Sequence, residues 1–118
     1  MNEGDNLLGR ILISPRAIAT IACQAALRSY GVAGMAPRNL VQGITHALAR
    51  DPRHGVEVRS VDGQIVIDLY VIVEYGTRIS SVAASVANTV RYQVEKALGT
   101  PIAAINVNVL DLRVSHTD

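Results

Sequence analysis

Residues 64–76, QIVIDLYVIVEYG, form an unusually apolar stretch that decides how this chain folds. Apolar side chains recur at every second position from Ile65 to Tyr75, which is the period of an extended strand with one buried face. The alternate positions mix apolar side chains with charged ones, among them Asp68 and Glu74. This pattern predicts a strand in a sheet that is covered on one side, with a second, mixed face whose role is the functional question.

The residues on the amino-terminal side of this strand predict its neighbours. Asp62-Gly63 is a strong signal for a two-residue hairpin turn, and it joins the long strand to an antiparallel strand over residues 56–61. Further upstream, residues 10–13 read as a short strand. Ser14-Pro15 then begins a helix, because serine caps a helix amino terminus and proline fits the first helical position.

Four further segments complete the order of elements. Residues 31–35, GVAGM, contain two glycines and are expected to form a turn and not a strand. Residues 38–50 have helical spacing, and residues 79–98 carry a clean apolar stripe at the same spacing, which ends at Gly99. Residues 104–114 alternate aliphatic side chains with asparagine, and they predict the last strand.

The order strand, helix, short helix, strand, strand, helix, strand (β-α-(α)-β-β-α-β) predicts the fold class. We expect an α+β fold with a four-stranded mixed sheet and helices on one face. With 118 residues, the chain has the size of a single domain, 1–118. Its core is expected to span about residues 9–114, with short flexible ends.

The composition argues against nucleic acid as a partner. Eleven basic and ten acidic side chains leave a net charge of +1, which neutralises no row of phosphates. The chain contains four tyrosines but no phenylalanine and no tryptophan, so it lacks an aromatic platform for stacked bases. Nucleic acid is therefore excluded from the expected partners.

Several features favour a soluble protein of the cytoplasm. Residues 1–6 are polar and acidic, the opposite of a signal peptide. Asp68 and Glu74 interrupt the apolar runs, and none reaches the ~20 residues of a membrane helix. Cys23 is the only cysteine, which rules out an internal disulfide, and its apolar neighbours predict a buried core position.

The chain has few groups suited to catalysis or metal binding. Its histidines are dispersed, and no two have metal-ligand spacing. They are His46, His54 and His116. Asp68 and Glu74 share a strand face but lie about 20 Å apart by strand geometry, too far for a catalytic carboxylate pair. Asp68 is expected to pair with Arg59 across the hairpin instead. We therefore predict no catalytic residue, no metal site and no cofactor, and do not expect an enzyme.

Two features are candidates for contacts with other molecules. The glycines of residues 31–35 permit a sharp turn, and an alternative is that this loop is a contact surface centred on Met35. The mixed face of the long strand, together with the last strand, is the other candidate, since an exposed patch of apolar and polar groups often marks an interface. The candidate interaction residues are Met35, Val66, Tyr70, Ile72, Asn106 and Asn108.

Four blocks of sequence resemble the alkaline shock protein family of bacterial envelope-stress proteins. They are residues 9–15 (GRILISP), 31–35 (GVAGM), 68–76 (DLYVIVEYG) and 105–109 (INVNV). The likeness spans about residues 9–114, nearly the whole chain. Four blocks in order at sensible spacing are more specific than any one of them.

The resemblance implies a small cytoplasmic protein at the inner face of the membrane. Such a protein would associate with itself, bind a membrane-anchored partner and support cell-envelope homeostasis. Family members are not known as enzymes, and the family has no active site to carry over. This chain departs from the family in residues 50–54, where a lysine-rich linker would be expected, and in having Arg16 early in the first helix.

Two other functions remain open from the residues alone. A small-ligand-sensing regulatory module would use Gly34, Asn106 and Asn108 at a dimer edge for backbone and amide contacts. An acylphosphatase-like enzyme would need a phosphate-binding loop with an arginine after the first strand. Ser14-Pro15-Arg16 opens a helix instead, which argues against that enzyme.

Overall fold

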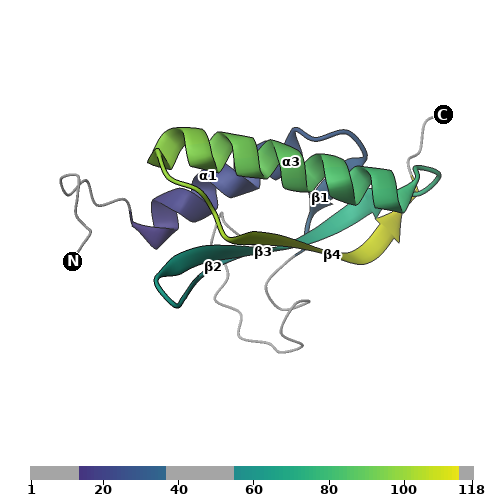
Figure 1. Ribbon diagram of the computed structural model, residues 1–118. Helices are drawn as coiled ribbons and strands as arrows, with labels where there is room; N and C mark the ends of the chain where they lie inside the picture. The colour runs from purple at the N-terminus through teal and green to yellow at the C-terminus, as the bar shows by residue number, and fades with distance from the viewer. Residues whose placement is uncertain (1–13, 37–54, 115–118) are drawn as a thin grey trace, which may run out of the picture.

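The computed structural model describes residues 14–36 and 55–114 (Figure 1). The strand expected at residues 10–13 and the helix expected at residues 38–50 lie outside the described residues, as do the three histidines. The described part contains two helices and four strands, arranged as one sheet with a helical layer.

Helix α1, Pro15–Leu27, begins where the sequence predicts. The Ser14 side chain accepts a hydrogen bond from the Ala17 N–H at 3.1 Å, which caps the helix. The buried side consists mainly of small residues, which allow the helix to approach the sheet closely. They are Ile18, Ala19, Ala22, Cys23, Ala25 and Ala26, so the core position predicted for Cys23 is confirmed.

The predicted hairpin of β2, Val56–Val61, and β3, Gln64–Glu74, is confirmed. Asp62 and Gly63 form its turn with φ values of 52° and 77°, and two consecutive positive φ angles suit a tight hairpin. β3 is the central strand. β2 and β1 (Val32–Met35) pair antiparallel along one of its edges, and β4, Ala104–Arg113, pairs parallel along the other. Within the described residues the sheet has four strands and is mixed, which agrees with the predicted fold class, but β1 is not one of the strands that the sequence predicts.

Strand β1 occupies a segment for which the sequence predicts a turn, and this prediction is wrong. Of residues 31–35, only Gly31 belongs to the turn, and its φ of 85° lies in the left-handed region that favours glycine. β1 then pairs with β3, and Ala33 is an extra residue that shifts the register. Backbone hydrogen bonds to a long neighbouring strand outweigh the weak strand propensity of a segment that contains glycine.

β1 and β2 lie end to end along the same edge of β3 and meet at Tyr70. The Ala36 N–H donates to the Tyr70 carbonyl at 2.9 Å, and the Tyr70 N–H donates to the Gly55 carbonyl at 2.8 Å. Gly55 has a φ of 81°, and a Cβ atom there would lie 2.7 Å from the Tyr70 carbonyl oxygen. Glycine is therefore required where the chain rejoins the sheet.

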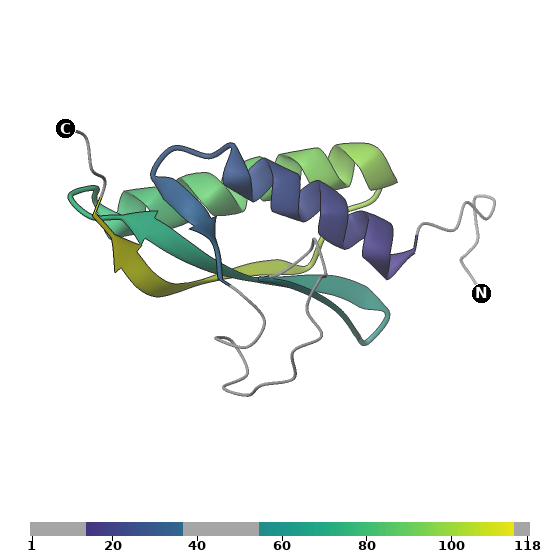
Figure 2. The same cartoon turned by 180° about the vertical axis from the view of Figure 1, so that it is seen from behind.

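Helix α3, Ile79–Leu98, covers the same face of the sheet as α1 (Figures 1 and 2), as predicted. It ends at Gly99, which has a φ of 75°. A stripe of valines on α3 packs against alternate side chains of β3 to form the core. The fully buried members are Ile67, Leu69, Val71, Val73, Val82, Val86, Val90 and Val94.

Candidate functional site

The sheet face turned away from α1 and α3, here called the outer face, gathers side chains from three strands. Successive side chains of a strand alternate between faces, and residues paired across strands share one. Ile67, Leu69 and Val71 pack under the helices, so the alternate residues of β3 and their partners form the outer face. It includes Glu57, Arg59, Val66, Asp68, Tyr70, Ile72, Asn106 and Asn108.

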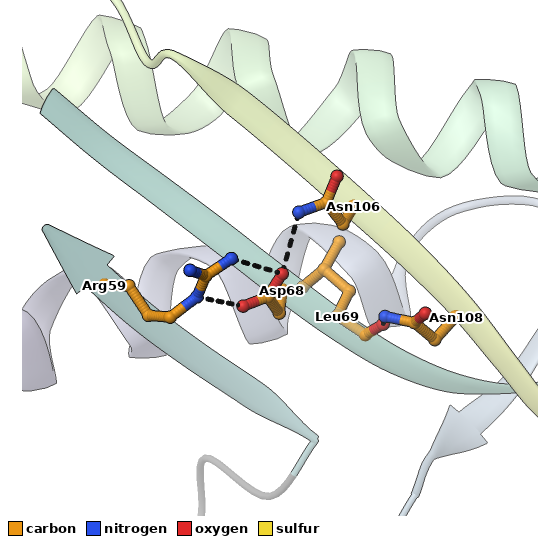
Figure 3. A network of polar contacts seen from close by, with 5 residues as sticks. All are labelled: Arg59, Asp68, Leu69, Asn106 and Asn108. Carbon is orange, nitrogen blue, oxygen red and sulfur yellow. Dashed lines mark hydrogen bonds and ion pairs between the residues drawn. The ribbon is translucent and has the colours of Figure 1, made fainter. Parts of the chain in front are cut away.

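Asp68 lies at the centre of a polar network that joins β2, β3 and β4 (Figure 3). Arg59 on β2 donates from Nε to Asp68 Oδ2 at 2.6 Å and from Nη2 to Oδ1 at 3.3 Å. Asn106 on β4 donates from Nδ2 to Asp68 Oδ1 at 2.8 Å. The carboxylate therefore accepts from both neighbouring strands. The pairing of Asp68 with Arg59 that the hairpin predicts is confirmed.

Hydrogen bonding and burial act in opposite directions on the carboxyl of Asp68, whose side chain is 10% exposed. The hydrogen bond from Arg59 is the largest influence and lowers the pKa of this carboxyl, whereas burial raises it and the Asn106 amide lowers it again. The net result is a pKa below the ordinary aspartate value. Asp68 is therefore a charged, structurally engaged group at neutral pH.

Tyr70 is the aromatic residue next to this network, and it is half-buried. Burial raises the pKa of its phenol, and the negative charge of Asp68 raises it further. The phenol therefore stays neutral in ordinary conditions, where it acts as a hydrogen-bond donor or acceptor and not as an anion.

Acidification is expected to remove the contribution of Asp68 to stability. Because the folded-state pKa is lowered, this contribution is complete above the unfolded-state value of about 4 and is lost as the pH falls through the folded-state pKa. Asp68→Asn keeps the side-chain shape, and we expect it to lower the free energy of unfolding by about 1–2 kcal/mol at pH 7. The effect is modest because the Arg59 side chain is 44% exposed and partly screened by water.

Urea titrations of both proteins at pH 7 and at pH 2 measure this difference. We expect the difference between the two free energies of unfolding to be smaller at the lower pH, because the native carboxyl is protonated as the pH falls through its lowered pKa. A difference of the same size at both pH values would show that the charge of Asp68 is not the source of its contribution.

The structure brings all but one of the predicted interaction residues together on the outer face. Val66 and Ile72 are 8% and 7% exposed, so the expectation that the whole mixed face is uncovered is wrong for these two side chains. They belong to the central strand, which is flanked on both sides. Tyr70 is half-buried, and Asn106 and Asn108 on β4 are exposed. The accessible part of the outer face is therefore polar.

Met35 does not join the other predicted residues. It pairs with Val71 on β1, which places it on the helix side of the sheet, and it packs partly buried against the core. Its surroundings are therefore apolar, and the structure separates it from the outer face.

The sequence did not reveal the role of Asn106. The alternation of asparagine with aliphatic side chains in residues 104–109 was visible, but the partner of Asn106 depends on the register of a parallel pair. Asn108 likewise bonds inward, donating from Nδ2 to the Leu69 carbonyl at 3.2 Å. Both asparagines therefore fix β4 to β3 while remaining accessible.

Three further observations concern the described residues outside this network. Within residues 14–36 and 55–114, no three His, Cys, Asp or Glu side chains lie together in a way that would hold a metal ion. A surface hollow of about 580 Å³ lies away from the network and has no charged lining; it is bounded by Gly63, Gln64, Ile65, Thr100, Pro101, Ile102 and Ala103. In the same part of the chain, no helix is long and apolar enough to cross a membrane.

Fold and site together define a small α+β domain whose sheet presents a polar network and accessible amides on its outer face. The chain belongs to the alkaline shock protein 23 family, described as having a cell envelope-related function, and a model of that family matches residues 3–114. The resemblance carried by the four sequence blocks is thereby confirmed. The family description names no reaction.

Two bacterial relatives cover nearly the whole chain. YloU of Bacillus subtilis is 41% identical over 110 residues, which is 92% of this chain and 92% of the relative. Spy1614 of Streptococcus pyogenes is 32% identical over 108 residues, 90% of this chain and 89% of the relative. Both are described as uncharacterized proteins, so they support the family and supply no substrate or partner.

Among solved structures, variants of MamM-CTD are similar at a lower level. One has a TM-score of 0.49 and 17% sequence identity, and the match covers 87% of this chain and 100% of that chain. At this identity and TM-score, the likeness carries no inference about function.

Proposed function

We propose that this protein is a non-enzymatic component of cell-envelope homeostasis that associates with itself and binds a membrane-anchored protein from the cytoplasmic side. The observation that carries the proposal is that neighbouring side chains hydrogen-bond to the Asp68 carboxylate. The buried carboxylate of the outer face is held by Arg59 and Asn106, so it rigidifies a surface and is not left as a free proton acceptor. The cell envelope-related function of the family supports the setting.

The accessible groups of the outer face suit a protein partner. Tyr70 and Arg59 are of the residue types that most often anchor protein interfaces, and the Arg59 side chain is 44% exposed. The exposed amides of Asn106 and Asn108 supply hydrogen bonds at the rim. Because the network ties three strands together, these groups are presented in a fixed arrangement, which lowers the entropic cost of binding.

Tyr70→Asp is expected to reduce binding of the membrane-anchored partner at least ~tenfold, because docking would desolvate a second carboxylate beside Asp68. The measurement is a pull-down with the immobilised protein from membranes of the same cell, with and without detergent. An integral membrane protein should be retained from the detergent extract by the unaltered protein and largely lost with the variant.

Tyr92→Asp is the matched control, since Tyr92 is 60% exposed on α3, in the helical layer. It should retain the membrane protein as the unaltered chain does. Equal retention by both variants would exclude the outer face as the contact surface. Recovery of no membrane protein by the unaltered chain would count against a membrane-anchored partner.

A small-ligand sensor is the second candidate, favoured by open space on the outer face. Gly34 lies there opposite Ile72, and a Cβ atom at Gly34 would meet no atom within 4 Å. Exposed Asn108 offers amide groups on the same face. A thermal-shift screen of amino acids and nucleotides separates the candidates, since a sensor requires saturable stabilisation by one of them. Absence of any such shift would reject the sensor.

A further inference from the structure

The two edges of the sheet are built differently. One edge consists of β1 and β2, which are four and six residues long and meet at Tyr70. β2 carries Glu57 and Arg59, and β1 has a register shift at Ala33. Short strands, charged side chains and bulges are the means by which proteins prevent an edge from pairing with another strand.

The β4 edge has none of these features over residues 104–109. The segment AINVNV contains no charged residue and no proline. β4 is ten residues long and pairs with β3 on one side, and the residues in the ranges 14–36 and 55–114 provide no strand on its other side. An edge segment without charges, proline or a bulge is a template for the addition of another strand.

The hydrogen bonds of β3 show which β4 residues face the open edge. Tyr70 directs its N–H and C=O at the edge formed by β1 and β2, so Leu69 directs its own at β4. In a parallel pair, a residue bonds to the two residues that flank its opposite number. Val107 is opposite Leu69, so its N–H and C=O point away from β3. The same holds for Ile105 and Val109.

Residues 105–109, Ile-Asn-Val-Asn-Val, read nearly the same in both directions. A strand of this kind matches a second copy of itself in antiparallel orientation. We infer that β4 pairs with β4 of a second copy about a two-fold axis at Val107. This inference rests on the proposed self-association and names the surface through which the two copies would associate. Like residues then face each other: Val107 opposite Val107, Ile105 opposite Val109, and Asn106 opposite Asn108.

The aliphatic side chains of this pairing extend the core across the axis. Ile105, Val107 and Val109 are half-buried and pack against the core on the helix side of the sheet. Their accessible surface would be covered by the second copy, which favours association. Each of the three also directs one N–H and one C=O at the open edge, so the pairing forms about six backbone hydrogen bonds.

The asparagines complete the pairing on the outer face. Each donates one Nδ2 hydrogen bond to β3, from Asn106 to Asp68 and from Asn108 to the Leu69 carbonyl. A primary amide has two N–H donors and an oxygen acceptor, so each side chain keeps one donor and its oxygen for the second copy. In the proposed register, the two asparagines meet at a position where cross-strand side chains lie closest.

The pairing ends at Leu110. At this point β4 has an extra residue relative to β3, and the charged residues Asp111 and Arg113 follow. A bulge followed by charges ends strand pairing. A two-fold axis uses the same surface of both copies, so the arrangement closes at a dimer and does not continue into a filament.

Cysteine cross-linking tests the register. In a Cys23→Ala background, Val107→Cys is expected to give a disulfide-linked dimer under mild oxidation, because the axis brings the two Cα atoms to about 5.5 Å. Val58→Cys is the control, since Val58 is also half-buried on the helix side but belongs to β2 at the opposite edge. This second variant should remain uncross-linked on a non-reducing gel.

Val107→Pro tests the backbone of the interface. The Val107 N–H points away from β3, so proline removes no hydrogen bond within one copy, whereas it removes both hydrogen bonds at the axis. We expect the dissociation constant of the dimer to rise at least ~tenfold in sedimentation equilibrium. If this variant fails to fold, the cross-linking result decides.

The outcomes distinguish this interface from self-association as such. A dimeric unaltered protein that gives no Val107→Cys cross-link, or cross-links equally through Val58→Cys, would overturn the β4 axis and leave self-association intact. A monomeric unaltered protein would overturn both. Selective cross-linking through Val107→Cys supports both.

Discussion

Gly55→Ala is expected to lower the free energy of unfolding by about 2–5 kcal/mol, from the strain of a positive φ and from overpacking. Gly55 has a φ of 81°, and an added Cβ atom would lie 2.7 Å from the Tyr70 carbonyl oxygen and 3.1 Å from Met35 Cβ. The carbonyl belongs to the central strand and has no free rotation by which to move away. Chemical denaturation followed by circular dichroism measures the loss.

Gly99→Ala is the matched control for this prediction. Gly99 has a similar φ of 75°, but a Cβ atom there would meet no atom within 4 Å. Its substitution should cost only the backbone strain, about 1–2 kcal/mol. Equal losses for the two variants would mean that the contact with Tyr70 contributes nothing, and that the joint between β1 and β2 has room for a methyl group.

Gly31→Ala is expected to have an effect of the same size, from a different contact. Gly31 has a φ of 85° at the turn between α1 and β1, and a Cβ atom there would lie 2.4 Å from Val82 Cγ2. Val82 is 1% exposed within the core, and a β-branched side chain has few alternative rotamers. We expect a loss of about 2–5 kcal/mol, measured by the same denaturation experiment.

A double-mutant cycle with Val82→Ala identifies the source of this loss. Val82→Ala removes both methyl groups that the new Cβ atom would meet, so it relieves the clash and leaves the φ strain. Gly31→Ala should therefore cost about 1–3 kcal/mol less in the Val82→Ala background than in the native protein. Strictly additive losses would show that the two residues do not meet.

The elements that the sequence predicted are those whose patterns are local. The alternation in residues 64–76 identifies a strand, and Asp62-Gly63 identifies its hairpin. Once the hairpin is formed, Arg59 and Asp68 are neighbours, although they are nine positions apart in sequence. The spacing of the valines in α3 is also a local pattern, so the sequence predicts this helix.

The features that the sequence did not predict depend on distant pairing. β1 is a strand because β3 provides its hydrogen bonds, while its own residues favour a turn. Asn106 hydrogen-bonds to Asp68 across a separation of 38 positions in the sequence. A periodic pattern of side chains does not indicate so distant a contact. Residues 105–109 are nearly palindromic in the sequence itself, but this matters only because, among residues 14–36 and 55–114, no second strand pairs with β4.

Two surfaces of the domain are thus proposed to make different contacts. The outer face, which the Arg59–Asp68–Asn106 network makes rigid, is the proposed contact surface for a membrane-anchored partner. The β4 edge is the proposed contact surface for a second copy. Asn106 belongs to both, since it bonds to Asp68 and lies opposite Asn108 of the second copy in the proposed register. A change at Asn106 should therefore affect both kinds of contact.

Light scattering on the unaltered protein tests the proposed self-association, because a protein that works through contacts between its own copies must associate in solution. One chain has a mass of 12.6 kDa. We predict a mass of twice this value at micromolar concentration. A mass of 12.6 kDa at every concentration would rule out self-association.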